Sequence, residues 1–338
     1  MRKGLRVGLE SMSPYSGKPR PRSEFTSQVG GALRAVVRAL RRFAYAAPVP
    51  LAPIEKPARR VRLGLALGGG FARGLAHIGV LKVLRENQIE IDSVSGTSIG
   101  SIVAAGLACG CTLDEMTAAA HRVRWSSVAR WTFPRFGFAT NEPLKAFLSK
   151  ALPCRTFEQL KLPLAIVAAD LRTGEEVVFR EGELITPLRA SCSFPGLFVP
   201  IEYRGRLLID GAIVNGVPVS ALSGVDVAVA VNIRSNGLER GPANLFEIVG
   251  ESFRITQNLN QSIWRDRSDL VIEPELKDFR WDDFGRAGEL IAAGEAAARR
   301  ALPALRVLVR QRIDEGVRKN QERRFTLPAT SAQWRPLT

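Results

Sequence analysis

Ser98 lies in the motif Gly96-Thr97-Ser98-Ile99-Gly100, in which a glycine stands two residues away on each side of a serine. The preceding segment Ile91–Ser95 is typical of a strand, and the following segment Ser101–Ala105 is typical of a helix. A serine on a sharp strand-to-helix turn exposes its hydroxyl at the end of a sheet, where it can attack an ester carbonyl. The spacing therefore predicts a nucleophile elbow, although small residues also gather at ordinary tight turns.

A nucleophilic serine needs a base, and the chain has only two histidines to supply the usual one. His77 lies in a predicted helix on the same face as Leu81 and Leu84, which favours a packing role. His121 ends the predicted helix 113–122, where a positive charge is favourable without any function. Neither histidine follows the last strands, so an ordinary Ser-His-Asp triad is not expected.

Asp210 is the candidate base that fits best. It closes the predicted strand Arg206–Ile209 and is followed at once by Gly211 and Ala212, which turn the chain and leave the carboxylate at the rim of the sheet. A carboxylate held there by backbone donors can take a proton directly from a serine hydroxyl. An Asp-Gly pair is equally typical of an aspartate that only caps a turn, and both interpretations stay open.

A third group is the glycine-rich loop Gly68-Gly69-Gly70-Phe71-Ala72-Arg73-Gly74, which separates the predicted strand Val61–Leu67 from the helix Leu75–Arg85. Glycines at such a turn let successive backbone amides point at an anion, and the N-terminus of the following helix favours negative charge. The anion could be a nucleotide phosphate or the oxyanion of a tetrahedral intermediate. The loop lacks both the G-K-[ST] ending and a clean G-x-G-x-x-G spacing, which disfavours the nucleotide.

The glycine loop, the serine motif and Asp210-Gly211-Ala212, in this order, resemble the patatin-like phospholipase family, which includes the esterase domain of neuropathy target esterase. The resemblance extends to Arg73–Leu81, Ala190–Phe198 and Asp210–Asn215, and it covers roughly residues 60 to 310.

The resemblance implies a role for each motif residue. Ser98 would be the nucleophile and Asp210 the base of a Ser-Asp dyad, with no metal and no cofactor. The backbone amides of Gly68, Gly69 and Gly70 would form the oxyanion hole. Phe71 stands where several relatives carry another glycine, which puts the detailed geometry of the loop in doubt. The other residues implied to support the site are Arg73, Gly74, Gly96, Gly100, Gly211 and Ala212.

The implied activity is that of a serine lipid acyl hydrolase, a phospholipase, lysophospholipase or carboxylesterase that works through an acyl-enzyme. Its substrate would be a phospholipid or lysophospholipid. Two alternatives stay open. The same dyad could pass the acyl group to an acceptor other than water, or the protein could be a membrane-associated regulator with little turnover.

The elements that must position these residues alternate between strand and helix, which predicts an α/β fold with a mostly parallel, doubly wound sheet. The resemblance sharpens this to a three-layer α/β/α sandwich. Beyond the strands already named, the sequence predicts strands at 164–169 and 225–231 and helices at 98–109, 242–263 and 285–302.

Charge and composition divide the chain into three parts: a basic arm, 1–58, a catalytic domain, 59–316, and a polar tail, 317–338. The chain has 338 residues, 46% of them hydrophobic, and a net charge of +15. Residues 1 to 60 hold 13 Lys or Arg against Glu10, Glu24 and Glu55, and their Ser, Pro and Gly content predicts disorder. The four cysteines show neither zinc-site spacing nor the density of a disulfide scaffold, which favours a reduced, intracellular protein.

Within the arm, Leu33, Val37 and Leu40 recur at helical spacing, with Arg34, Arg38 and Arg41 on another face. Such a cationic amphipathic helix can bind an anionic membrane surface, pack on the body or act as a basic linker. No apolar run is long enough to span a bilayer, so we expect a cytoplasmic protein, peripheral on the inner membrane face where the arm binds lipid. No nucleic acid partner is expected, and the sequence does not indicate an oligomeric state.

The segment 121–141 combines aromatic and cationic residues, among them Trp125, Trp131, Phe138 and Arg130. This mixture suits a lid at a lipid interface, and it equally suits a long loop whose aromatic side chains pack onto the body.

Overall fold

The computed structural model describes residues 60–132, 137–234, 237, 241–242 and 245–325. The chain divides into two units, 1–57 and 58–338, and the described residues all belong to the second. The predicted arm with its amphipathic helix lies outside them, as do residues 133–136 of the predicted lid.

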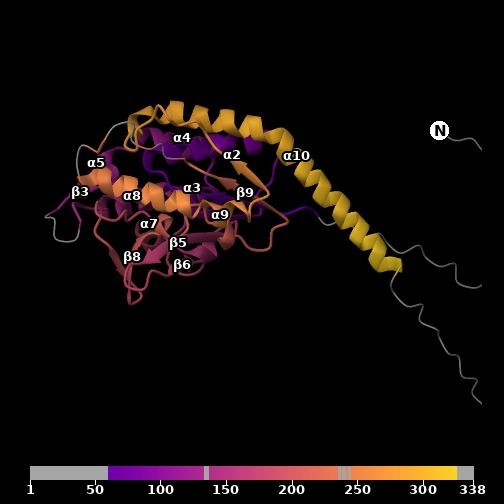
Figure 1. Ribbon diagram of the computed structural model, residues 1–338, viewed down its shortest axis with the longest axis horizontal. Coiled ribbons are helices and arrows are strands. Elements are labelled where there is room, and N and C mark those ends of the chain that lie inside the picture. Colours follow the sequence, from indigo (N-terminus) through magenta and orange to yellow (C-terminus); the bar gives the residue numbers. More distant parts are fainter. Residues whose placement is uncertain (1–59, 133–136, 235–236, 238–240, 243–244, 326–338) are drawn as a thin grey trace, which may run out of the picture. The chain divides into compact units, whose positions relative to one another are not determined.

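A mixed, mostly parallel sheet forms the centre of this unit, with helices packed on it (Figure 1). Its strand order is β10-β9-β1-β2-β5-β8-β7, with β6 paired to β5. The strands from β10 to β5 are parallel, whereas β6 and β8 run antiparallel to β5. The strands are β1 (Leu63–Leu67), β2 (Ser93–Thr97), β5 (Leu164–Asp170), β6 (Glu176–Phe179), β7 (Ile201–Tyr203), β8 (Arg206–Asp210), β9 (Val227–Val231) and β10 (Leu270–Ile272).

Helices of several lengths and short 3-10 turns connect the strands, and a small two-stranded sheet lies apart from the main one. The helices are α2 (Ala76–Glu86), α3 (Ile99–Ala108), α4 (Leu113–Arg122), α5 (Trp125–Val128), α6 (Glu142–Ala151), α7 (Ile185–Ser191), α8 (Leu245–Leu259), α9 (Gln261–Arg265) and α10 (Ala287–Phe325). The 3-10 helices are η1 (Phe71–Leu75), η2 (Phe157–Gln159), η3 (Gly211–Ile213), η4 (Val219–Ala221) and η5 (Phe284–Arg286). The small sheet consists of β3 (Arg130–Trp131) and β4 (Ala139–Thr140).

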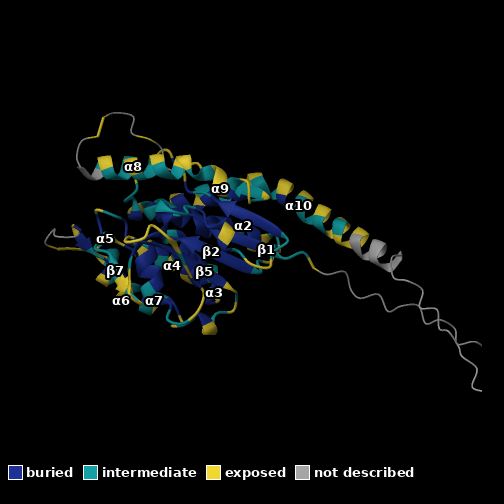
Figure 2. Cartoon of the chain, turned by 60° about the horizontal axis from the view of Figure 1, so that its bottom comes forward, coloured by how far each residue is buried: buried dark blue, intermediate teal, exposed yellow. Residues whose placement is uncertain are grey.

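The two faces of the main sheet carry side chains of different size, because successive residues of a strand point to opposite faces. Large apolar residues such as Leu65 and Val229 face the main core, which α2, α3 and α10 cover. On the other face, Ala66, Ala228 and Ala230 pack against Trp264 of α9 and the segment around η4. The central strands are buried throughout (Figure 2). These layers confirm the predicted α/β/α sandwich.

The C-terminal helix is longer than the sequence pattern predicts. The expected helix 285–302 continues in α10 to Phe325, so the first residues of the predicted polar tail are helical. Exposed helices can be polar on every side, so the loss of apolar periodicity does not mark where such a helix ends. No helix among the described residues is long and apolar enough to cross a membrane.

Candidate active site

Ser98 occupies the turn between β2 and α3 with φ of 55° and ψ of −130°, a left-handed conformation that is strained for a residue with a side chain. Strand and helix approach closely on either side of it. A Cβ atom on Gly100 would lie 2.2 Å from the Leu67 carbonyl oxygen, and one on Gly96 would lie 2.4 Å from Ser101 Cα. Only glycine fits at both positions, which is the physical reason for the spacing of the motif.

The strained turn is held by hydrogen bonds from three buried groups. The Ser98 amide donates to Ser191 Oγ at 2.8 Å, and Ser191 Oγ in turn donates to the Val167 carbonyl at 2.6 Å. On the other side, Ser101 donates to the Ser98 carbonyl from its amide at 2.9 Å and from its hydroxyl at 2.6 Å. Ser98 itself is 7% exposed. Its backbone is therefore fixed in one geometry by α7 and α3.

Asp210 lies at the end of β8, buried beside Ser98. Its Oδ1 accepts from the Ala212 amide at 2.9 Å, and the nearby Ser98 side chain favours the charged form of the carboxylate. Burial raises the pKa of Asp210 to about 7, and the Ala212 amide and the Ser98 side chain oppose the rise because they favour the charged form. A carboxylate with a pKa near 7 is suited to take and return a proton at neutral pH.

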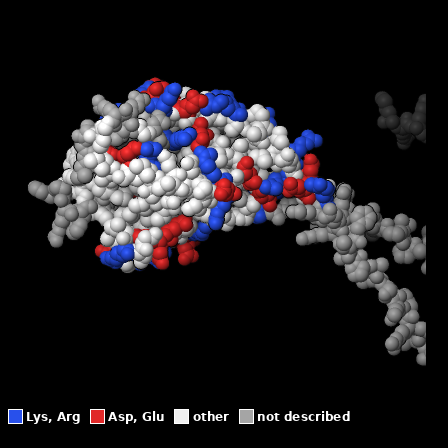
Figure 3. All heavy atoms as spheres, in the orientation of Figure 1, with Lys and Arg blue, Asp and Glu red and all other residues white. Residues whose placement is uncertain are grey.

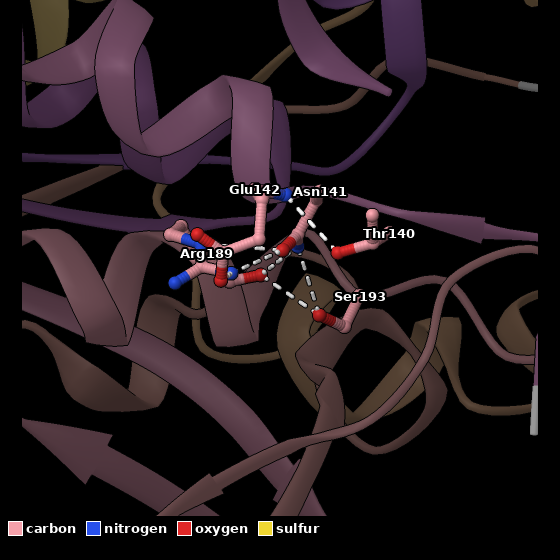
Figure 4. Close-up of polar contacts among 5 residues, drawn as sticks. All are labelled: Thr140, Asn141, Glu142, Arg189 and Ser193. Atoms are coloured by element: carbon pink, nitrogen blue, oxygen red, sulfur yellow. Dashed lines mark hydrogen bonds and ion pairs between the residues drawn. The ribbon is translucent and has the colours of Figure 1, made fainter. Parts of the chain in front are cut away.

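The backbone of Asp210 is held by Ser193, which lies two residues beyond α7, the helix whose Ser191 binds Ser98. The Asp210 amide donates to the Ser193 carbonyl at 2.9 Å. Ser193 belongs to a buried polar cluster in which Asn141 Nδ2 donates to Ser193 Oγ at 3.0 Å and to the Arg189 carbonyl at 2.9 Å (Figure 4). Arg189 donates back to Asn141 Oδ1 and pairs with Glu142.

Sequence reasoning assigned no role to Ser191, Ser193 or this cluster. The segment Ala190–Phe198 belonged to the family resemblance, which was the only signal in the sequence that could have singled them out.

Cys192, which follows α7, lies near Ser98. The side chains of Ser98 and Ser101 lie close enough to its thiol to favour the thiolate form. Burial, reinforced by the nearby Asp210 charge, raises the pKa of the thiol well above its usual range, so the group is a neutral thiol at neutral pH. Ser98 thus lies near both a neutral thiol and the Asp210 carboxylate.

The glycine-rich loop after β1 lies directly against Ser98 and Ala212. A Cβ atom on Gly69 would lie 3.3 Å from Ser98 Cβ and 3.4 Å from Ala212 Cβ. However, the Gly68 amide donates to the Val231 carbonyl at 3.0 Å and the Gly69 amide to the Gly216 carbonyl at 3.2 Å. Two of the three predicted oxyanion donors are thus already hydrogen-bonded within the protein. Within the described residues, no backbone carbonyl pairs with the remaining one, the Gly70 amide.

Phe71, the residue that departs from the family pattern, adopts φ of 50°. Aromatic packing holds it in this left-handed conformation, because its ring makes edge-on contacts with Phe194 and Trp281, with centroids 5.2 Å away in each case. Trp281 in turn contacts Trp125, whose ring stacks on Phe198. We call Phe71, Trp125, Phe194, Phe198 and Trp281 the aromatic cluster.

The aromatic cluster includes Trp125, which belongs to the predicted lid, 121–141. Trp125 packs within the cluster, whereas Trp131 is 66% exposed and Phe138 is 45% exposed. The structure thus shows packed and exposed aromatic residues in the same segment, and a lid function stays a prediction.

The two histidines lie apart from the reacting groups. His77 is fully buried in α2, and its Nε2 lies 2.8 Å from the Gly68 carbonyl. Burial lowers the pKa of His77 to about 4, so the ring is neutral and its Nε2–H donates to the glycine loop. His121 is at the end of α4. The remaining motif residues serve packing: Gly74 lies against Ile99, and Gly211 against Val167. Arg73 lies in η1, and its bracing role stays a prediction.

The described residues contain no group of three or more His, Cys, Asp or Glu side chains that could hold a metal ion.

Comparison with known proteins identifies the domain. Residues 65–223 match the family described as patatin-like phospholipase. An uncharacterized NTE family protein of Mycobacterium tuberculosis is 36% identical over 199 residues, which cover 58% of this chain and 55% of that protein. The lysophospholipase NTE1 of Pyricularia oryzae is 32% identical over 181 residues, 51% of this chain and 12% of that protein. The chain therefore carries a patatin-like phospholipase domain, as the motifs indicated.

The matches differ from this chain in length and, for the solved structure, in sequence. The chain spans about half the length of the mycobacterial relatives that it matches. Among solved structures, VipD from Legionella pneumophila has a TM-score of 0.44 at 14% identity, over 77% of this chain and 67% of that one.

Proposed function

We propose that this protein is a serine lipid acyl hydrolase in which Ser98 and Asp210 act as a dyad. The observation that carries the proposal is the placement of the buried Asp210 carboxylate beside Ser98, which occupies a strained turn. The patatin-like phospholipase domain supports it independently.

The reaction would follow from this geometry in two stages. As Ser98 Oγ attacks the ester carbonyl, Asp210 takes the hydroxyl proton. It then returns the proton to the departing alcohol, and the product is an acyl-enzyme. Asp210 next takes a proton from water, whose oxygen attacks the acyl carbonyl, and Ser98 recovers its proton as the fatty acid leaves. In both stages the Gly70 amide, with the Phe71 amide at the start of η1, would stabilise the oxyanion.

An apolar pocket of about 740 Å³ supports a substrate with a long acyl chain. It lies among α2, α3, α4 and α6, and its walls include Leu75, Ile99 and Phe147. Ile99 directly follows the nucleophile, so a chain lying in this pocket would begin beside Ser98. A fatty acyl chain fits such a wall because burial of each methylene contributes about 0.8 kcal/mol.

The test compares Ser98→Ala and Asp210→Asn with the matched controls Ser252→Ala and Asp114→Asn, which alter exposed residues away from the site. Hydrolysis of a soluble ester should fall at least about a thousandfold in the first pair and stay unchanged in the second. A fluorophosphonate should label Ser98 in the wild-type protein and the two controls, only slowly in Asp210→Asn, and not at all in Ser98→Ala. Full activity in either dyad variant would contradict the proposal. Products formed with added lysolipid acceptors would reveal acyl transfer.

We also propose that the protein lies peripherally on anionic membranes through its basic arm. The body offers a second apolar contact, because Ile248, Ile255 and Leu259 are exposed along one side of α8. Charges of both signs are interspersed on the face drawn in Figure 3, with wide uncharged areas between them. Deletion of residues 1–58 should weaken binding to anionic liposomes in a salt-dependent way and spare turnover of a soluble ester. Unchanged liposome binding would make the arm a linker.

A further inference from the structure

A second pocket, of about 650 Å³, has Gly69 of the glycine-rich loop in its wall. We call it the polar pocket, because amide and cationic side chains such as Asn232, Gln257, Arg234 and Arg254 line it. No Asp or Glu is among the described residues that line it. Its composition is thus the opposite of that of the apolar pocket beside Ile99.

The wall of the polar pocket touches both members of the dyad through one residue each. Gly69 lines the pocket and lies against Ser98, since a Cβ atom on Gly69 would be 3.3 Å from Ser98 Cβ. Ala212 also lines the pocket, and its amide donates to Asp210 Oδ1 at 2.9 Å. A group bound in this pocket would therefore lie next to the ester bond that Ser98 attacks.

Two arginines line the pocket, and one of them, Arg254, forms an ion pair with Glu251. Arg254, on α8, donates from Nε and Nη2 to Glu251 Oε1, which orients the guanidinium and leaves Nη1 without a hydrogen bond within the described residues. Arg234 follows β9, is exposed and makes no hydrogen bond or ion pair with another described residue. Arginine is the side chain best suited to bind phosphate oxygens, because its planar donors match the geometry of the anion. A neutral glyceride has no phosphate group for these cations to bind.

We propose that the polar pocket binds the phosphate of a glycerophospholipid or lysophospholipid headgroup, with Arg234 and Arg254 as its ligands. The inference rests on the proposed hydrolase function. It adds the orientation of the substrate: the acyl chain lies along the apolar pocket, the ester carbonyl lies at Ser98, and the phosphate lies against α8. The enzyme then selects phosphate-bearing esters over neutral ones.

The experiment measures kcat/KM for a lysophospholipid and a monoacylglycerol of the same acyl chain, both in neutral detergent micelles. The variants are Arg234→Gln, Arg254→Gln and their combination. Arg267→Gln is the matched control, because Arg267 is an exposed arginine near α9 that does not line the pocket. We expect the double variant to lose about tenfold to a hundredfold on the lysophospholipid and less than about twofold on the monoacylglycerol, since charge-assisted hydrogen bonds are involved.

Several results would overturn the inference. An equal loss on both substrates would show that the arginines only support the fold. The same would follow if Arg267→Gln matched the double variant, because net charge would then be the cause. Stronger competition by inorganic phosphate than by a glycerophosphodiester would assign the pocket to free phosphate. Failure of the hydrolase function itself is separate, because it would remove fluorophosphonate labelling of Ser98 in the wild-type protein.

Discussion

Two strand-to-helix turns meet at the candidate site, and each holds a residue with a side chain in the left-handed region. Ser98, after β2, has φ of 55°, and Phe71, after β1, has φ of 50°. The Ser98 turn is held by buried hydrogen bonds from Ser191 and Ser101. The Phe71 turn is held by the rings of Phe194 and Trp281. The same backbone strain is thus maintained by polar contacts in one turn and by aromatic packing in the other.

The two turns therefore depend on different parts of the molecule. Hydrogen bonds constrain distance and direction, so the backbone of Ser98 is positioned by the buried Ser191 of α7. Aromatic packing is less directional, and it ties the oxyanion loop to a cluster that extends to Trp125 and the exposed Trp131. The loop is therefore the part of the site that contacts near the surface can adjust.

The largest effect should come from Gly100→Ala, which disturbs both turns at once. The added Cβ would lie 2.2 Å from the Leu67 carbonyl oxygen and 2.6 Å from that of Gly68, so α3 must move away from the oxyanion loop. We expect a loss of about 3 kcal/mol or more in the free energy of unfolding and no measurable esterase activity. Denaturant unfolding and a soluble ester assay measure both.

Gly106→Ala is the control in the same helix. Its Cβ would meet only the flexible end of Met116, at 3.1 Å, and we expect a change within about 1 kcal/mol. Equal stability of the two variants would show that the close approach at Gly100 is unimportant.

The second effect is the pH dependence of kcat/KM, which tests Asp210 as the base. Burial raises the pKa of Asp210 to about 7, and the base must be ionised to accept the proton of Ser98. As pH falls below 7, kcat/KM for a soluble ester should therefore fall about tenfold per unit, and it should level off above 7. His77, whose pKa is lowered to about 4 by burial, stays neutral over this range. A profile that is flat from pH 5 to 8 would contradict this assignment of the base.

The third effect isolates the polar support of the nucleophile. Ser191→Ala removes the acceptor of the buried Ser98 amide, which costs about 1 to 3 kcal/mol of stability. We expect kcat to fall about tenfold, with KM for a soluble ester nearly unchanged, because the nucleophile is displaced and substrate contacts remain. Ser252→Ala, on the exposed side of α8, is the control. A higher KM with an unchanged kcat would place Ser191 in substrate binding instead.

The smallest effect should come from weakening the aromatic packing that surrounds Phe71. Phe71→Leu keeps an apolar side chain and removes ring contacts worth about 0.5 to 1.5 kcal/mol each. We expect kcat for a soluble ester to change by about twofold to fivefold, with the pH midpoint unchanged. If Phe71→Leu lowered kcat more than Ser191→Ala, the contrast between the two turns would be reversed.

Local patterns predicted much of the fold because the central strands are short apolar runs bounded by glycine turns. The predicted strands at 164–169 and 225–231 correspond to β5 and β9. Helix α7 was not predicted, because a seven-residue helix is too short to show a clear period. Ser191 at its end and Ser193 just after it therefore had no visible role, although they bind the backbones of Ser98 and Asp210 respectively.

By itself the sequence determined the chemistry that is available: an elbow serine, a strand-end aspartate and a glycine-rich loop, in an order that matches a known family. Only the tertiary structure decided which amides of that loop are already hydrogen-bonded, that Asp210 is buried enough to raise its pKa, and that Arg234 and Arg254 line a pocket beside it. The reason is physical. Local spacing sets backbone geometry, whereas burial and the pairing of polar groups depend on segments more than a hundred residues apart along the chain.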